Sequence, residues 1–190
     1  MSLGFWETLT SIQAQGTAIT AAARTSMTVG STQARFTLPA NKVKQVGDMF
    51  WLKATGIISS VVATPGTGRF DLGFGANVVF DTQAMSLNTT AKTSVPWILD
   101  VLGTVRAVGT NANIMWQGTW ESEDLVGSPL PTVGGSGVVS VPYNIDPPVV
   151  GASFDSTVTQ FIDFFFTQTL TTGSCSLNQL MVSFLTSTGY

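Results

Sequence analysis

The chain has 190 residues, a formal net charge of −3 and no histidine, and a length of this order suits one domain with a sizeable core. Its eight Lys and Arg residues are scattered, whereas a nucleic-acid groove needs clustered cations. The lack of histidine removes the Ser-His-Asp and Cys-His systems and the usual zinc sites.

Residues 1–34 are rich in Thr, Ala, Gln and Ser and show no firm period, which predicts an extended N-terminal arm before a domain over 35–190. Phe5 and Trp6 are its prominent aromatic residues, and we expect them to anchor the arm in a neighbouring protein. The alternative is an arm that is frayed or folded back on its own domain. This start has no basic segment followed by an apolar one, and the chain has no run of about 18 apolar residues, so we expect neither a secretion signal nor a membrane span.

Residues 34–39 alternate and stop at Pro39, which predicts a first strand. Two further alternating runs, 50–58 and 70–74, flank a Pro- and Gly-containing segment at 64–68. We therefore predict that these two runs pair as an antiparallel hairpin. Trp51 breaks the alternation of the first run, which leaves an exposed position open for its side chain, although alternation favours the core for most of the tryptophans.

Residues 95–107 and 114–120 also alternate, with Gly109 and Asn111 between them, which predicts a second hairpin. Its inward parity includes Trp97, Trp116 and Trp120, which are expected to be core residues.

Residues 126–150 are rich in Gly, Pro, Ser and Val and predict a long loop with a short edge strand at 138–141. The last runs, 156–170 and 175–186, are apolar on both parities, as in strands covered on two sides. We expect the aromatic part of the first of these runs to form an oligomer interface, through Phe161, Phe164, Phe165 and Phe166. Strands at this spacing without a convincing helix predict an all-β fold, an antiparallel β-sandwich with jelly-roll topology.

The residues that carry chemistry favour no enzyme. Cys175 has no cation beside it in the sequence, which indicates a structural thiol in a reducing compartment. A glycoside hydrolase would need two acids across a sugar, and Asp71 with either Asp100 or Asp163 is the available pair, although each lies on a polar parity where a solvated acid is expected. The acidic run at 121–124 lacks a calcium-loop pattern, so we expect no metal and no cofactor.

Hydrophobic residues make up 44% of the chain and charged residues 10%, against about 25% charged in ordinary domains. This balance predicts that part of the folded surface is buried against other subunits. The alternative is a monomer kept soluble by its Ser, Thr, Gly and Asn residues.

Three segments carry a resemblance to a known class of protein: ARFTLPAN at 34–41, ATGIISSVVATPGT at 54–67, and FGANVVFDTQAMSLNTTAKTSVPWILDVLGTVRAVGT from Phe74. Together they resemble a type of small virion protein encoded by tailed double-stranded DNA bacteriophages. The resemblance implies a structural component without catalytic residues, made in the bacterial host cytoplasm and located in the virion.

Within that class we expect a capsid decoration or minor capsid protein, a homotrimer that contacts the major capsid protein or other virion proteins. The alternative is a tail or tail-tip component whose 126–150 loop and exposed aromatic residues, Trp51 among them, bind host glycans.

Overall fold

The structure is a computed structural model that describes residues 6–12, 14–28, 35–60, 66–123, 126–128 (backbone only), 137–142, 151, 153–171 and 173–187. No helix in these ranges is long and apolar enough to cross a membrane.

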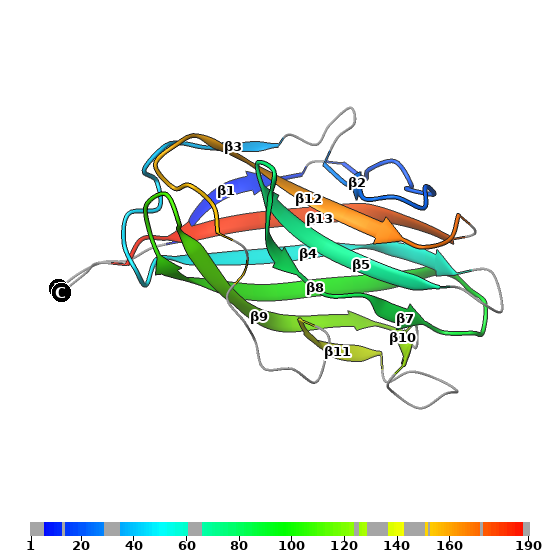
Figure 1. Ribbon diagram of the computed structural model, residues 1–190. Helices are drawn as coiled ribbons and strands as arrows, with labels where there is room; N and C mark the ends of the chain where they lie inside the picture. The colour runs from blue at the N-terminus through cyan, green and yellow to red at the C-terminus, as the bar shows by residue number, and fades with distance from the viewer. Residues whose placement is uncertain are drawn as a thin grey trace.

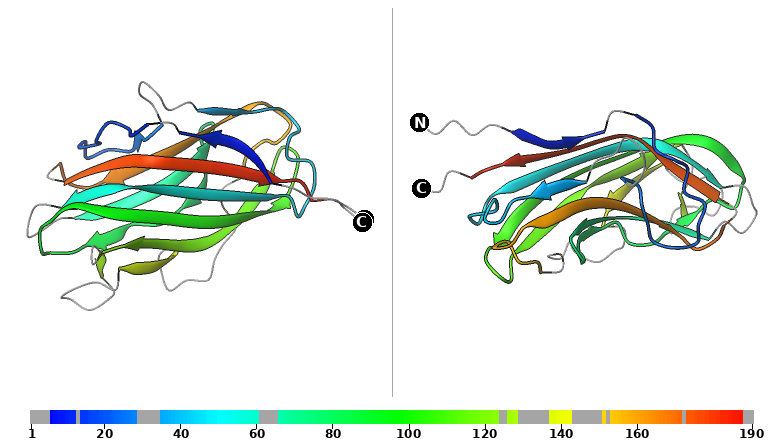
Figure 2. Two further views of the ribbon diagram at one scale, coloured as in Figure 1. Left: turned by 180° about the vertical axis from the view of Figure 1, so that it is seen from behind. Right: turned by 90° about the horizontal axis from the view of Figure 1, so that it is seen from above.

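The strands of the described residues form two antiparallel sheets that pack face to face, as seen edge-on in Figure 2. Sheet A has the spatial order β1 (Glu7–Ser11), β13 (Gly173–Leu185), β4 (Met49–Ser60), β8 (Lys92–Ala107), β9 (Asn113–Ser122), β11 (Val138–Val141). Sheet B has the order β10 (Val126–Ser128), β7 (Met85–Leu87), β5 (Thr67–Phe74), β12 (Gln160–Gln168), β2 (Thr25–Ser26), with β3 (Phe36–Leu38) also on β12 and β6 (Asn77–Asp81) also on β5. The predicted all-β antiparallel sandwich is confirmed. The jelly-roll topology is not confirmed, since β4 lies between β13 and β8 in sheet A (Figure 1).

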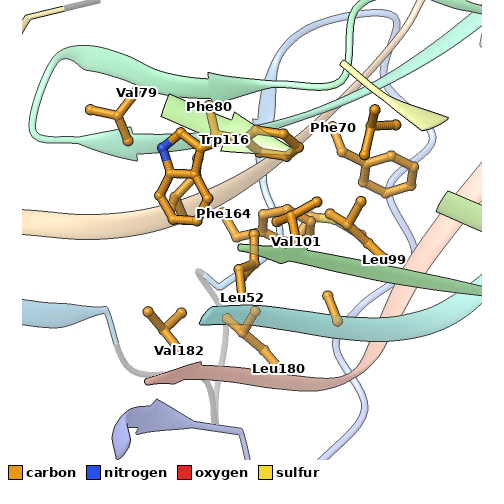
Figure 3. Close-up of a cluster of buried hydrophobic side chains, with 14 of the residues drawn as sticks. Leu52, Phe70, Val79, Phe80, Leu99, Val101, Trp116, Phe164, Leu180 and Val182 are labelled. Atoms are coloured by element: carbon orange, nitrogen blue, oxygen red, sulfur yellow. The ribbon is translucent and has the colours of Figure 1, made fainter. Parts of the chain in front are cut away.

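The core lies between the sheets and is filled by the inward parity of each strand. Figure 3 shows Leu52, Leu99 and Val101 of sheet A gathered with Phe70 and Phe164 of sheet B. Aromatic rings make many of these contacts, and the predicted core indoles are all buried, at Trp97, Trp116 and Trp120. Buried apolar area of this kind is the main favourable term in folding.

The predicted hairpin between residues 50–58 and 70–74 is wrong, although both strands exist. The first run lies in β4, which pairs with β8 and β13 in sheet A. The second lies in β5, which pairs with β6, β7 and β12 in sheet B. Both runs turn their apolar parity toward the same core from opposite sides. Alternation therefore gave the correct inward faces, but it does not specify which strand is the hydrogen-bonded partner.

The second predicted hairpin is confirmed, because β8 pairs with β9 from Trp97↔Ser122 to Ala107↔Asn113. The predicted edge strand at 138–141 is also present as β11, paired with β9. The two last runs form β12 and β13, which lie in different sheets.

The described part of residues 6–28 packs against the sandwich, which is the alternative that the sequence left open for the arm. β1 pairs with β13 in sheet A, Ile19 bridges to Cys175, and β2 pairs with β12 in sheet B. Leu9 and Met27 are buried with the core. The segment thus runs along the edge strands of both sheets on one side of the molecule (Figure 1).

Candidate functional site

The outer face of sheet B carries carboxylates that are each held by an arginine. Arg24 Nε donates to Asp71 Oδ1 and Oδ2 at 3.1 and 3.0 Å, and its Cζ lies 3.4 Å from the centre of the Phe165 ring. Asp71 is 1% exposed, so the guanidinium supplies the partner that a buried carboxylate requires. Arg69, on the same strand as Asp71, donates from Nε to Oδ1 of Asp81 on the neighbouring strand β6 at 2.7 Å.

Asp163 has a similar environment on β12. Arg35 Nε lies 2.9 Å from Asp163 Oδ2, and Ser26 Oγ donates to Asp163 Oδ1 at 2.7 Å. The hydroxyl of Thr28 donates to the same oxygen. Three side chains from the N-terminal part of the chain therefore converge on one buried acid, which ties that segment to sheet B.

These contacts correct the prediction that Asp71 and Asp163 are solvated acids on an open strand face. Both are buried, because residues 24–28 and Arg35 cover this part of the outer face of sheet B. Asp100 lies on β8 of sheet A and is not on a strand adjoining Asp71. The described acids of sheet B are arranged as ion pairs, and their position does not leave two free carboxylates facing a cleft.

The predicted interface phenylalanines divide into two pairs by parity. Phe164 and Phe166 are fully buried in the core, so the prediction is corrected for these two: they have no surface to offer a second subunit. Phe161 faces outward and is 52% exposed, and Phe165 is partly buried beneath Arg24. An interface through Phe161 and Phe165 stays a prediction.

Of the two predicted anchoring residues, Phe5 lies outside the described residues. Trp6 is 39% exposed and packs edge-on against Trp51, with ring centroids 6.0 Å apart. Its indole therefore lies on the outside of the chain's own sheet A, and its role as an anchor stays a prediction.

Cys175 is a free, fully buried thiol at the start of β13. Burial raises the pKa of this thiol well above its ordinary value, because the thiolate would lose its hydration. This environment agrees with a structural cysteine.

The outer face of sheet A is the more open surface and combines aromatic, charged and apolar groups. Trp51 Nε1 donates to Asp100 Oδ1 at 2.7 Å, and Lys53 Nζ lies 3.3 Å from Asp100 Oδ2. Asp100 thus holds the orientation of the indole from the next strand. Leu102, the cross-strand partner of Trp51, is 42% exposed.

A shallow open hollow of about 480 Å³ continues this face over β8, β9 and β11. Leu102 and Met115 provide its apolar part. The polar part of its lining comes from one guanidinium, one amide and three hydroxyls: Arg106, Gln117, Thr104, Thr119 and Ser140. The size is at the lower end for small-molecule sites.

Periodicity along the sequence does not reveal this hollow. The sequence signal for the hollow is the set of outward-facing positions on three strands, where polar side chains alternate with the core residues. That signal could not be used without the order β8-β9-β11, which brings Thr104, Thr119 and Ser140 onto one surface.

The predicted absence of a metal remains an expectation. In the described ranges, no group of three or more His, Cys, Asp or Glu side chains is placed to hold a metal ion. Asp124 of the acidic run lies outside these ranges, as does most of the predicted 126–150 loop except β10 and residues 137–142.

The chain is thus an antiparallel β-sandwich in which ion pairs cover part of the outer face of sheet B, while the outer face of sheet A carries the hollow. No protein-family model and no curated protein matches the chain. One solved structure to which it is similar is the CBM2 module of the evolved Dit of Lactobacillus casei BL23 phage J-1. The TM-score is 0.35 and the identity 10%, over 98% of this chain and 99% of that one. A similarity this low supports no inference about function.

Proposed function

We propose that this chain is a non-enzymatic structural protein of a phage particle, most specifically a capsid decoration or minor capsid protein that self-associates. The observation that carries the proposal is two exposed apolar residues, Phe161 near the start of β12 and Val158 two residues before that strand, here called the patch. They are 52% and 48% exposed. An exposed phenylalanine of this kind is expected at a contact between subunits. The resemblance of residues 34–110 to small virion proteins supplies the phage context.

Self-association is tested by sedimentation velocity of the purified chain at micromolar concentration. We expect a trimer for the wild type. Covering the exposed half of one phenylalanine contributes about 2 kcal/mol, so Phe161→Ser is expected to weaken association by at least about tenfold. Val46→Ser is the matched control, since Val46 is 58% exposed in the loop before β4 and outside the patch. A monomeric wild type, or equal effects of both substitutions, contradicts the proposed interface.

Attachment to a particle is tested separately, by adding purified chain to capsids that lack it and locating it by electron microscopy. Density on the shell supports the decoration role. Density confined to the tail favours the alternative, and no attachment to either argues against a virion role.

The second candidate function is a glycan-binding module of a tail or tail tip. The specific observation that favours it is the pair Trp6 and Trp51 on the open face of sheet A, with the second indole oriented by Asp100. Aromatic rings presented in this way suit the apolar faces of sugar rings. Binding on a glycan array that is lost in Trp51→Ala but kept in Phe161→Ser, which alters the opposite sheet, supports this function.

A further inference from the structure

The hollow on the outer face of sheet A is built around Arg106, which has a different environment from the other arginines. Arg24, Arg35 and Arg69 each lie against a carboxylate. Arg106 is exposed, and Nη2 lies 3.6 Å from the Met115 sulfur, with no carboxylate oxygen of the described residues within ion-pair distance. A thioether is a weak acceptor, so the donors of this guanidinium are available to an anion.

The groups around Arg106 specify more than a negative charge. Thr104 and Gln117 offer hydroxyl and amide groups that both donate and accept hydrogen bonds, while Leu102 and Met115 supply apolar surface. The Thr119 hydroxyl donates to Glu121 Oε1 at 3.4 Å and is left as an acceptor. A ligand that matches this lining has one acidic group, several hydroxyls and an apolar face. A guanidinium binds the two oxygens of a carboxylate as a bidentate pair.

The aromatic surface lies within reach of the same ligand. The Trp51 indole donates to Asp100, and Arg106 is six residues further along β8, a separation of about 20 Å. An oligosaccharide of several sugars that packs on the Trp51 indole therefore extends across the hollow to Arg106.

We propose that this hollow binds the carboxylate-bearing sugar of an acidic polysaccharide, with Arg106 on the carboxylate, the hydroxyl and amide side chains on the sugar hydroxyls, and Trp51 on a ring several sugars further along the same polysaccharide. The inference rests on the second candidate function and adds the chemical class of the ligand. An acidic peptide is the less suitable occupant, because one cation among several neutral hydroxyl and amide groups matches a polyhydroxylated ligand better than a run of carboxylates.

The experiment uses the full chain and an array of uronic-acid and sialic-acid oligosaccharides, each beside its neutral carboxyl-reduced counterpart, with poly-glutamate as a peptide probe. We expect acidic members to bind, their neutral counterparts to bind about tenfold more weakly or worse, and binding to weaken as salt is raised. Arg106→Gln is expected to remove the preference for the acid, and Arg106→Lys to restore only part of it. Lys44→Gln is the control, because it removes the same charge from an exposed loop position.

Each other outcome overturns the inference and separates it from the proposed function. Binding of neutral and acidic members alike, lost in Trp51→Ala, leaves the glycan-binding function intact and refutes the acidic subsite. An acid preference that survives Arg106→Gln refutes the assignment of Arg106. Binding of poly-glutamate in preference to sugars refutes the ligand class, and an array without any binding refutes the glycan function and the subsite together.

Discussion

Replacing Arg24 by glutamine is expected to lower the free energy of unfolding by about 2–4 kcal/mol, because it leaves the Asp71 carboxylate buried without its cation. Removing one partner of a buried ion pair costs about 3–5 kcal/mol. The Arg24 side chain is 39% exposed, so water screens part of this cost, while losing the contact with the Phe165 ring adds about 0.5–1 kcal/mol.

The measurement is urea unfolding followed by tryptophan fluorescence, with a thermal melt as the second readout. At about 2–4 °C per kcal/mol for a chain of this length, the midpoint is expected to fall by about 4–16 °C. Arg106→Gln removes an arginine from the open face of sheet A and is the control, with an expected change below about 0.5 kcal/mol.

The double variant Arg24→Gln with Asp71→Asn distinguishes a stranded charge from a general loss of packing. The asparagine amide at position 71 carries no charge, so its burial without a cation costs less than burial of the aspartate carboxylate. The double variant is therefore expected to be more stable than Arg24→Gln alone. Faster hydrogen exchange at residues 25–28 is expected in Arg24→Gln if the segment detaches before the sandwich unfolds. The reasoning is refuted if Arg24→Gln behaves like the control, or if adding Asp71→Asn makes it less stable still.

Three further predictions follow from burial. Gly103→Ala places the new Cβ 2.6 Å from the Trp116 indole and is expected to lower the free energy of unfolding in urea by about 1–3 kcal/mol. Gly68→Ala is the control: its Cβ meets only ordinary contacts from 3.4 Å outward, and the expected loss is less than about 1 kcal/mol. Phe164→Ala is expected to cost about 3–5 kcal/mol and Phe161→Ala clearly less, since only the first ring is fully buried; equal losses would contradict the assigned faces. Burial raises the pKa of the Cys175 thiol, so the folded chain retains a proton that the unfolded chain loses above pH ~8.5. Stability is therefore full below that pH and declines above it by up to about 1.4 kcal/mol per pH unit, and Cys175→Ala is expected to remove this component from unfolding curves recorded between about pH 8 and 10.

Much of the secondary structure could be predicted from alternation, because a strand with one buried face shows its period directly. The pairing was predictable only where the connection was tight, as between β8 and β9. Where the chain passes from one sheet to the other, as between β4 and β5, both strands show the same apolar alternation as a hairpin would. Trp51 lies on the outer face, in keeping with a parity opposite to that of Phe50 and Leu52.

The candidate site was harder to predict because it depends on contacts between distant segments. The burial of Asp71 and Asp163 comes from Arg24 and Arg35, and nothing in the strands themselves indicates that a separate segment covers them. The hollow beside Arg106 likewise arises from side chains of three strands, whose order the sequence does not state.

The pairing of β1 with β13 and of β2 and β3 with β12 has a consequence for how the protein is made. On the ribosome, residues of the first segment emerge long before the strands that they will pair with have been translated. Neither sheet can therefore close on that side during most of elongation, and contacts this far apart in sequence form slowly. The unpaired strands of a nascent chain are open to wrong partners in the meantime. Completion of both sheets on that side is therefore expected only after the last strand has left the ribosome.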